Sequence, residues 1–332
     1  MVKKRMNIFL TGGSGFVGSN LIPHFLEQGH TVYAIARSDK SAAQVEALGA
    51  KVVRDDLLFL STTTKSALNE CDLVVHSAAH IDFTYDPKPF YALNVEATKQ
   101  LLAMAETAGV QRFIYISAAP VVPGSPIKNL REHEAAEGLP AALYPKTKAL
   151  GEQAVLAANK PGFTTLSLRP PAIWGANNPH FEELFTNARK GRWRWIGGSR
   201  QVLSTIHIKN LSAAISAAVK ADVNGGEAYF VTDGDRRSMR TTIAAIMQAH
   251  GIDPGDKELP KGVAVLMANV LRVIWRLLGL KSRPPIAPLM IRLMVNEFSV
   301  VDQKARQELG YVNALSFEEG IKEIHQMKVI RH

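Results

Sequence analysis

The sequence predicts an α/β fold, in which a doubly wound parallel sheet with helices on both faces is joined to a smaller C-terminal substrate lobe. In the first half of the chain, short apolar runs alternate with amphipathic segments of helical length, which is the pattern of βαβ units. A glycine-rich turn follows the first apolar run, where such folds bind phosphate groups. The 332 residues, 46% of them hydrophobic and 21% charged, are sufficient for a large core.

The first apolar run, residues 7–10, is a strand that leads into the glycine-rich turn at residues 11–18. We expect Gly12 to permit the tight turn, Gly15 to let the backbone approach a pyrophosphate, and Gly18 to let helix and strand pack closely. The pyrophosphate would then lie on the free amides at the N-terminus of the following helix. Because the spacing is GxxGxxG and not GxGxxG, the glycines alone also fit a turn that binds no ligand.

A second strand is predicted at residues 31–36, after a helix over residues 16–29. In dinucleotide-binding folds an acidic residue at the end of this strand holds the ribose hydroxyls. Here Ala36 takes that place and Arg37 follows, so no carboxylate repels a 2′-phosphate and a guanidinium can pair with one. The sequence therefore favours NADP(H), with NAD(H) as the alternative. In the competing interpretation, Arg37 is a solvated charge at the end of the strand.

The alternation continues with three more strands and a helix, predicted at residues 51–53, 72–79, 112–117 and 94–108 respectively. In a parallel sheet of this kind, ligands bind beyond the carboxyl ends of the strands. Residues of five segments fall there, namely Gly12, Arg37, Asp56, Ala78 and Ser117. We expect them to share one rim of the sheet.

A helix predicted to begin at Tyr144 and to continue to about Asn159 carries the candidate catalytic pair. Tyr144 and Lys148 are four residues apart, so they lie on the same helical face. An ammonium beside a phenol lowers the phenol pKa from its reference of about 10, which makes the phenol a usable acid or base near neutrality. This spacing is common by chance, and an exposed tyrosine and lysine are the competing interpretation. Its place after a nucleotide-binding half favours catalysis.

Taken together, these motifs resemble the extended short-chain dehydrogenases/reductases, the NAD-dependent epimerase/dehydratase superfamily, from residue 6 to about residue 325. The likeness rests on residues 11–18, Asp56-Leu57, His76-Ser77-Ala78-Ala79, Asn94-Val95, Tyr144 to Lys148, and residues 168–175. Residues 204–211 and 305–311 make the chain most similar to the branch of 3β-hydroxysteroid dehydrogenases and dihydroflavonol reductases.

The resemblance implies a Rossmann-type domain at residues 1–170, and a mostly substrate-binding lobe at 171–332 with some segments returning to the sheet. It also implies hydride transfer, in which Tyr144 exchanges a proton with the substrate oxygen while Lys148 holds the nicotinamide ribose and tunes Tyr144. Cofactor contacts are implied for Gly12, Gly15, Phe16, Val17, Gly18, Arg37, Asp56, Leu57, Ala78, Ala79, Asn94, Lys148 and Pro170. A homodimer is implied as well.

One position departs from the family pattern. The family ends its fifth strand with two hydroxyl residues, and the second bonds the substrate oxygen, but here Ser117 is followed by Ala118. Because side chains alternate along a strand, Ser117 replaces that hydroxyl only if the chain changes path locally, which Pro120 and Pro123 would allow. Losing one such donor typically costs roughly 10²–10³ in rate, so Tyr144 alone would still support turnover. Ser117 is kept as a catalytic candidate.

Composition excludes several other classes. The net charge of +9 is scattered along the chain without a nucleic-acid-binding motif, so we expect no nucleic-acid partner. The lone Cys71 fits a reducing compartment, and a cytoplasmic location is expected. We expect neither a signal peptide nor a spanning helix. The histidines His76, His180 and His207 lack ligand spacing, so no metal site is expected and each is interpreted as a surface or packing residue.

The segment 263–280 reads as an amphipathic helix in which Leu266, Val270 and Leu277 share an apolar face, and Arg272 and Arg276 lie away from it. A second apolar piece, residues 286–295, follows. Three interpretations stay open: a lid over an apolar substrate, core or dimer packing, and binding in a membrane interface, which a basic amphipathic helix permits. Trp174, Trp193 and Trp195 fit either core packing or the cleft surface.

The sequence therefore predicts an NADP(H)-preferring oxidoreductase that interconverts a secondary alcohol and a ketone on an apolar, sterol-like or long-chain substrate. A nucleotide-sugar epimerase or dehydratase is the alternative, although the apolar region after residue 263 disfavours a sugar nucleotide. A cofactor-binding sensor or scaffold with little catalysis is the second alternative, because of Ala118.

Overall fold

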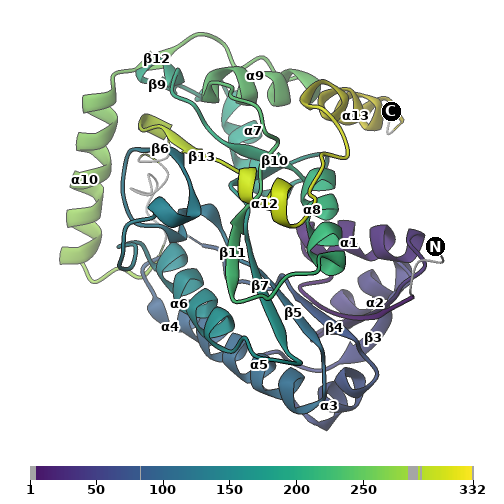
Figure 1. The fold of residues 1–332 in the computed structure, drawn as a ribbon. Coiled ribbons are helices and arrows are strands. Elements are labelled where there is room, and N and C mark those ends of the chain that lie inside the picture. The colour runs from purple at the N-terminus through teal and green to yellow at the C-terminus, as the bar shows by residue number, and fades with distance from the viewer. Residues whose placement is uncertain (1–4, 83, 283–290, 292–293, 331–332) are drawn as a thin grey trace.

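The computed structural model describes residues 5–82, 84–282, 291 and 294–330. Seven parallel strands form the central sheet (Figure 1): β1 (Asn7–Thr11), β2 (Thr31–Ala36), β3 (Lys51–Arg54), β4 (Leu73–His76), β5 (Arg112–Ile116), β7 (Thr164–Arg169) and β11 (Glu227–Phe230). Their order is β11-β7-β5-β4-β1-β2-β3, which reverses direction between β1 and β4. The predicted doubly wound parallel sheet is therefore confirmed.

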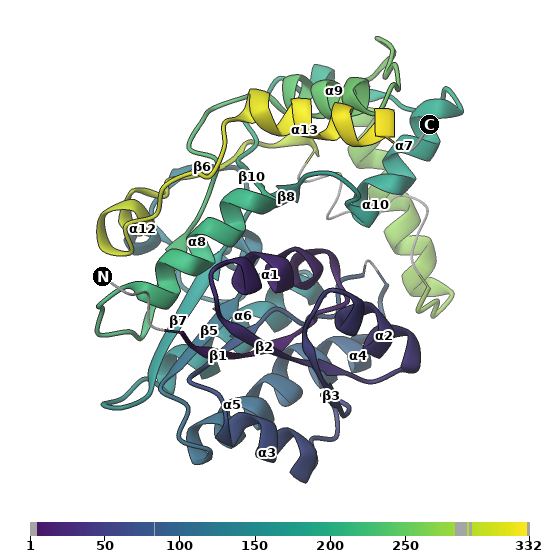
Figure 2. The same cartoon turned by 90° about the vertical axis from the view of Figure 1, so that its right-hand side faces the viewer.

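Helices cover both faces of this sheet, as Figure 2 shows most clearly. One face carries α1 (Phe16–Glu27), α2 (Asp39–Ala47) and α8 (Ile208–Lys220), and the other carries α3 (Thr62–Asn69), α5 (Ala97–Thr107) and α6 (Leu143–Ala157). Strands buried on both sides read as continuous apolar runs, which is why β1, β4 and β5 were detectable from sequence. The predicted fourth strand was too long, because the chain leaves the sheet after His76.

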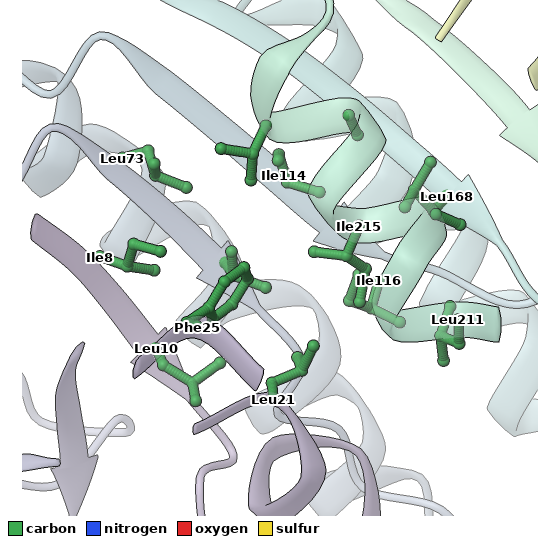
Figure 3. Packing of buried hydrophobic residues seen from close by; sticks show 14 of the residues in the cluster. Ile8, Leu10, Leu21, Phe25, Leu73, Ile114, Ile116, Leu168, Leu211 and Ile215 are labelled. Atoms are coloured by element: carbon green, nitrogen blue, oxygen red, sulfur yellow. The ribbon is translucent and has the colours of Figure 1, made fainter. Parts of the chain in front are cut away.

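The largest core lies between the sheet and the α1/α8 layer (Figure 3). Ile8 and Leu10 of β1 pack with Phe25 of α1, and Ile114 of β5 belongs to the same cluster as Ile215 of α8. All five side chains are fully buried. Helix α8 comes from the second half of the chain, so the sheet is completed by segments far apart in sequence.

The turn after β1 has the close packing that its glycines predict. Gly12 has a φ of +71°, a conformation that L side chains rarely adopt. A Cβ on Gly18 would lie 2.2 Å from the Gly12 carbonyl oxygen, so only glycine fits there. These two expectations are confirmed: the turn is tight, and α1 begins in contact with it.

The helix predicted to open at Asn94 begins earlier. Helix α4 (Pro87–Tyr91) runs into a π-helical turn, η1 (Ala92–Glu96), which continues as α5. The Asp86 side chain caps α4 by accepting the Lys88 amide, and a proline at the first helical position is pre-organised for a helix. Asn94 therefore lies inside a helix, in a π turn of the kind often found at functional sites.

The remaining elements lie mostly in the second half of the chain. Three parallel pairs form small sheets: β8 (Ala172–Trp174) with β10 (Thr205–His207), β9 (Trp195–Ile196) with β12 (Glu258–Leu259), and β6 (Ile127–Leu130) with β13 (Phe298–Val300). The helices there are α7 (Glu182–Arg189), α9 (Met239–Ala249), α10 (Lys261–Leu277), α12 (Gln303–Glu308) and α13 (Phe317–Ile330). The division of the chain at residue 170 stays a prediction.

Two of the tryptophans belong to a separate core in this region. Trp174 and Trp195 are fully buried, whereas Trp193 is half-buried beside them. Core packing therefore accounts for Trp174 and Trp195, and a cleft-surface role is ruled out for both. Across the residues that the structure describes, no helix combines the length and apolarity needed to cross a membrane.

The Gly18 contact yields a first prediction. Gly18→Ala places a methyl group against the Gly12 carbonyl, and overpacking of this kind costs about 1–3 kcal/mol of unfolding free energy. Chemical denaturation measures the change. Gly262→Ala is the matched control, because a Cβ there meets no atom within 4 Å and alanine favours the helix. Equal stability of Gly18→Ala and the wild type would contradict the packing described here.

Candidate functional site

The carboxyl ends of β1, β4 and β5 lie side by side and form the rim of the candidate site. Thr11 pairs with His76, and His76 pairs with Tyr115, so the segments that leave these three strands are neighbours. The Ser77 hydroxyl donates to the Thr11 carbonyl at 2.7 Å, and the Ala78 amide donates to the Thr11 hydroxyl at 3.1 Å. The glycine-rich turn and the Ala78 segment are therefore fixed against each other at the switch point of the sheet, where such folds bind ligands.

The N-terminus of α1 offers free backbone donors at this rim. The first amides of a helix have no acceptor within the helix, which at α1 applies to Phe16, Val17 and Gly18. Gly15 is the N-cap residue and supplies no side chain, and the first turn contains no acidic residue. A Cβ at Gly15 would meet only the Gly12 carbonyl, so the outer side of the turn is open. These residues fit the pyrophosphate of a dinucleotide.

Arg37 and Asp56, which follow β2 and β3, are brought together further along the rim. Their charged groups are 3.7 Å apart, with the arginine side chain 71% exposed and the aspartate 29% exposed. Exposed ion pairs contribute about 0–1 kcal/mol, so the pair leaves the guanidinium available to a stronger anion. Asp56 also accepts the Leu58 amide at 3.0 Å, and Leu57 is buried.

Helix α6, which carries Tyr144 in its first turn, is fixed to the sheet by side-chain hydrogen bonds. The Glu152 carboxylate accepts hydrogen bonds from the Ser167 hydroxyl at 2.7 Å and from Arg169 Nη2 at 2.6 Å, which fixes α6 to β7. A Cβ on Gly151 would lie 2.4 Å from the Asn94 carbonyl oxygen, so α6 also contacts the π turn directly. Tyr144 itself is half-buried and packs with the apolar cluster around Ala118.

The ammonium of Lys148 is fully buried behind Tyr144. Its Nζ donates to the Ile116 carbonyl at 2.6 Å and lies 3.8 Å from the centroid of the Tyr115 ring. Burial lowers the pKa of Lys148 to about 7, although the Glu152 carboxylate opposes that shift. A lysine that titrates near neutrality is typical of a functional site.

The pKa of Tyr144 shifts in the direction opposite to the one that we expected. Desolvation raises the pKa of its phenol above the ordinary value. The lowering predicted from Lys148 was wrong for this structure, because the ammonium is directed to the Ile116 carbonyl and the Tyr115 ring. Spacing placed both residues on one helical face but did not determine where the long lysine side chain points.

Ser117 keeps its side chain buried at the end of β5. Its hydroxyl lacks a hydrogen-bond partner within the described structure, and its amide donates to the Leu168 carbonyl at 2.8 Å. Alternation along β5 puts Ser117 on the same side as Tyr115, which faces α6. The backbone stays extended through Ala118 and turns only at Ala119. The local change of path that would let Ser117 replace the second hydroxyl therefore does not occur before Ala118.

Ala118 packs in one apolar cluster with Tyr144, Val121 and Ala149. A methyl group therefore occupies the position where the family carries its second hydroxyl. Pro170 is buried next to this segment, and its carbonyl accepts the Ala119 amide at 2.8 Å. Ala79 is half-buried beyond β4. The structure thus brings Ser117, Pro170, Tyr144 and Lys148 to one end of the sheet.

A buried hydrogen-bond network that the sequence did not reveal joins these parts. Thr98 Oγ1 donates to the Asn94 carbonyl at 3.0 Å, so it accepts from His76 Nε2 at 2.9 Å. His76 Nδ1 then accepts from the Thr11 hydroxyl at 2.6 Å, and the imidazole is neutral. Burial and the nearby Lys148 charge lower the pKa of His76 to about 3, in agreement with a neutral ring.

The network continues from Asn94 to α6. The Asn94 amide nitrogen donates to the Thr147 hydroxyl at 3.1 Å, and its oxygen accepts the His80 amide at 2.7 Å. Asn94, predicted to bind the cofactor, thus connects three backbone segments of the rim. Of the two interpretations given to His76, surface or packing residue, the structure supports packing. The only sign of the network in the sequence was that a polar residue ends an otherwise apolar strand.

Two further features complete the surroundings. A groove of about 590 Å³ lies beside the start of α6, lined by Pro120, Val122, Leu139, Pro145 and Phe298 among others. It adjoins the residue after Tyr144, but no predicted catalytic residue lines it. Within the described ranges, no group of three or more histidine, cysteine or acidic residues has an arrangement that could hold a metal.

Comparison with known proteins gives a consistent result. A model of the 3-beta hydroxysteroid dehydrogenase/isomerase family matches residues 9–261. The chain is 35% identical over 323 residues to a 4-hydroxy-2-methyl-3-oxo-4-farnesyl-3,4-dihydroquinoline-1-oxide ketoreductase of Stigmatella aurantiaca, covering 97% of this chain and 96% of the relative. It is 30% identical to a decarboxylating sterol-4-alpha-carboxylate 3-dehydrogenase of Dictyostelium discoideum, with 96% and 99% covered.

Solved structures agree at the level of the fold. A UDP-glucuronic acid 4-epimerase from Bacillus cereus, solved with UDP-glucuronic acid and NAD, superimposes with a TM-score of 0.74. The match covers 98% of this chain and 100% of the epimerase, at 20% sequence identity. At that identity the likeness concerns the fold alone.

The buried imidazole generates a second prediction. Unfolded histidine titrates near 6.5, whereas His76 in the folded state titrates near 3, so below pH 6.5 the unfolded chain binds a proton that the folded chain does not. The stability that His76 contributes is therefore complete above pH 6.5 and decreases as the pH falls towards 3. His76→Gln should lower the unfolding free energy by about 1–3 kcal/mol at neutral pH, because one glutamine amide does not reproduce the geometry with which the imidazole bonds both Thr11 and Thr98.

The pH dependence provides the specific readout for this prediction. Between pH 6.5 and 5, the stability of His76→Gln should fall less steeply than that of the wild type, by up to about 1.4 kcal/mol per pH unit. Denaturant unfolding at several pH values measures both slopes. His133→Gln, at a side chain that is 75% exposed, is the control. Identical slopes for His76→Gln and the wild type would contradict a buried neutral imidazole.

Proposed function

The chain belongs to the 3-beta hydroxysteroid dehydrogenase/isomerase family, and from this we propose that it is an NADP(H)-preferring oxidoreductase that interconverts a secondary alcohol and a ketone. It is an NAD(P)-dependent enzyme of the short-chain dehydrogenase/reductase type. The observation that supports hydride chemistry at this site is that the glycine-rich turn and the Tyr144–Lys148 helix meet at one rim of the sheet. The free amides of α1 lie at the end of β1, and Lys148, behind Tyr144, bonds the last carbonyl of β5.

We propose that Tyr144 is the proton donor and acceptor. Its raised pKa keeps the phenol protonated at neutral pH, which is the form that can give a proton to a carbonyl oxygen. When bound, the reduced nicotinamide supplies the hydride that adds to the carbonyl carbon. Tyr144 gives its proton to the oxygen as the alkoxide charge develops, and the resulting phenolate regains a proton from solvent. The reverse direction runs through the same residue.

Lys148 and Ser117 support this step in the proposal. Lys148 would hold the nicotinamide ribose. To stabilise a Tyr144 phenolate, its positively charged ammonium would have to turn from the Ile116 carbonyl and the Tyr115 ring, to which it is directed here. Its pKa of about 7 means that the free enzyme loses this charge as the pH rises through neutrality. The unpartnered Ser117 hydroxyl stays a candidate second donor, but it lies on the side of the strand opposite to Ala118, so it would reach the substrate oxygen only after a local change of path.

The NADP(H) preference rests on Arg37. A 2′-phosphate placed beyond β2 would meet an exposed guanidinium whose present partner, Asp56, is 3.7 Å away. A phosphate pairs with a guanidinium more strongly than an exposed carboxylate does, because it offers several charged oxygens to the planar donors. Gly12, Gly15 and the amides of α1 would hold the pyrophosphate, with Asp56 and Leu57 near the adenine and Ala78, Ala79 and Pro170 along the rest of the cofactor.

We propose an apolar substrate of sterol-like or long-chain type. Relatives that match nearly the whole chain are a ketoreductase of a farnesylated quinoline oxide and a sterol carboxylate dehydrogenase. A 3-beta-hydroxysteroid dehydrogenase of Mycolicibacterium neoaurum, 31% identical over 95% of this chain, supports the same substrate class. The groove beside α6 has a mostly apolar lining, although Ser125, Asn296 and Glu297 also belong to it and no predicted catalytic residue does, so it gives this proposal only secondary support.

Two alternatives are separable by experiment. An epimerase or dehydratase of nucleotide sugars shares the fold, and a protein that binds the cofactor without turnover is motivated by Ala118. A panel of hydrophobic ketones and UDP-sugars, assayed with NADPH, distinguishes both from the reductase. A cytoplasmic location and a homodimer remain part of the proposal; the lone Cys71 supports the former.

Tyr144 gives a third prediction. Tyr144→Phe removes the transferable proton but keeps the ring, so turnover of any ketone that the wild type reduces should fall by roughly 10²–10⁴-fold. NADPH affinity, followed by fluorescence titration, should stay near the wild-type value because the cofactor contacts remain. Tyr33→Phe, which removes a hydroxyl that accepts from Lys51 at 3.1 Å, should leave turnover unchanged. Unaltered turnover in Tyr144→Phe would remove this residue from the mechanism.

Arg37 gives a fourth prediction, which concerns cofactor preference. Arg37→Asp replaces the cation by a repelling carboxylate, so NADPH affinity should fall by roughly 10- to 100-fold while NADH affinity holds or improves. Titrations of the wild type and the variant with both cofactors measure this, with Arg200→Asp on the exposed surface as the control. If the wild type binds NADH more tightly than NADPH, the cofactor assignment is wrong.

A further inference from the structure

Helix α10 carries large apolar side chains on its outer surface. Its exposed members are Val263, Leu266, Met267, Val270, Val273, Ile274 and Leu277, and Leu278 and Leu280 continue the surface beyond the helix end. Leu266 is 64% exposed and Leu277 is 80% exposed. Figure 1 shows α10 at the outer edge of the molecule. We call this set of nine side chains the α10 apolar face.

The opposite side of α10 is the one that packs on the protein. Ala264 and Ala268 are buried in the core that also contains Trp195, while Leu271 and Trp275 are half-buried. These four positions follow helical spacing and form one face. The helix is therefore attached through two buried alanines and the half-buried Leu271 and Trp275, whereas the side chains of the α10 apolar face point outward. Among the residues that the structure describes, this disfavours core packing for the α10 apolar face; most of the second apolar piece, residues 286–295, lies outside the described residues.

Basic residues border the apolar face. Lys261, Arg272, Arg276 and Lys281 are all exposed, and the sequence from 261 to 281 contains no acidic residue. Arg272 and Arg276 lie one turn apart on the flank between the buried alanines and the apolar side chains. A cationic flank beside an exposed apolar face is the pattern of a helix that lies in a membrane interface.

We propose that α10 docks on the surface of an anionic phospholipid bilayer, with its apolar face among the acyl chains and its basic flank at the headgroups. The charge argues for this occupant. Anionic headgroups neutralise Lys261, Arg272, Arg276 and Lys281, whereas a second α10 would bring only further cations to them. The net charge of +9 attracts the whole chain to the same surface.

The position of α10 connects docking to the candidate site. The helix begins directly after β12 of the small lobe, and just beyond its end the Lys281 carbonyl accepts the Tyr85 amide at 3.0 Å. Tyr85 belongs to the segment that follows Ala78 and Ala79 at the rim. α10 thus joins the small lobe to the cofactor rim, and docking would hold that rim next to the phase in which an apolar substrate is concentrated. This consequence rests on the proposed function; the docking does not.

Vesicle co-sedimentation tests the proposal directly. The full chain is mixed with vesicles of pure phosphatidylcholine, or with vesicles in which about a quarter of the lipid is phosphatidylglycerol. We expect binding to the anionic vesicles, weakened by salt, and little binding to the neutral ones. Substituting Leu266, Val270 and Leu277 together by glutamine should reduce binding at least about tenfold. Arg272→Gln with Arg276→Gln should reduce it by roughly 25-fold, because each basic residue contributes roughly fivefold.

The controls separate this proposal from the others. Val312→Gln with Met327→Gln removes exposed apolar side chains far from α10 and should bind vesicles like the wild type. NADPH titration and ketone turnover are measured in vesicle-free buffer, so loss of docking with intact turnover leaves the proposed function standing. Absence of wild-type binding to anionic vesicles overturns the docking proposal, as does equal binding by the leucine and valine variant. Light scattering in solution then measures the oligomeric state. If the wild type is a dimer that does not bind vesicles, and the leucine and valine variant is a monomer, a second copy of the chain covers the α10 apolar face.

Discussion

The arrangement of the candidate site depends on one buried imidazole at the switch point of the sheet. His76 ends β4, accepts from Thr11 at the end of β1 and donates to Thr98 of α5. Through Asn94 the same chain of hydrogen bonds reaches Thr147, one residue from Lys148. Apolar packing fixes how far apart two elements are, but hydrogen bonds also fix direction and register. The glycine-rich turn and the helix of Tyr144 are therefore oriented by the same network, and not merely packed in one core.

The second determinant is a buried cation. An ammonium out of water is costly unless polar groups compensate it, and Lys148 has the Ile116 carbonyl, the Tyr115 ring and Glu152 one turn away. The compensation is partial, which is why its pKa lies near 7. A fold selected for stability alone would place an apolar side chain here. The retained lysine and the desolvated Tyr144 in front of it fit acid–base chemistry, where burial and shifted pKa values go together.

Sequence patterns predicted the parts of this protein that depend on local periodicity. Residues 31–36 form β2 as expected, because an apolar run between two turn residues allows little else. Contacts between distant segments were not predictable: Thr11 and His76 are 65 residues apart, and Asn94 and Thr147 are 53 apart. The early start of the helix at α4 was missed, although Asp86 and Pro87 form a local capping signal. The four-residue spacing of Tyr144 and Lys148 likewise did not predict which groups the Lys148 ammonium contacts.

Helix α10 shows a different limit of periodicity. An amphipathic pattern is normally interpreted by placing the large apolar side chains inward, but here Ala264 and Ala268 face the core and Leu266 and Leu277 face solvent. Small residues let a helix approach its support closely, and here the half-buried Leu271 and Trp275 complete the packed face. Exposed apolar patches of this extent are uncommon on monomers, because they promote association and contribute nothing to the core. The backbone hydrogen bond between Tyr85 and Lys281 joins the end of α10 to the segment that follows Ala79, so the exposed face and the candidate site belong to one connected part of the molecule.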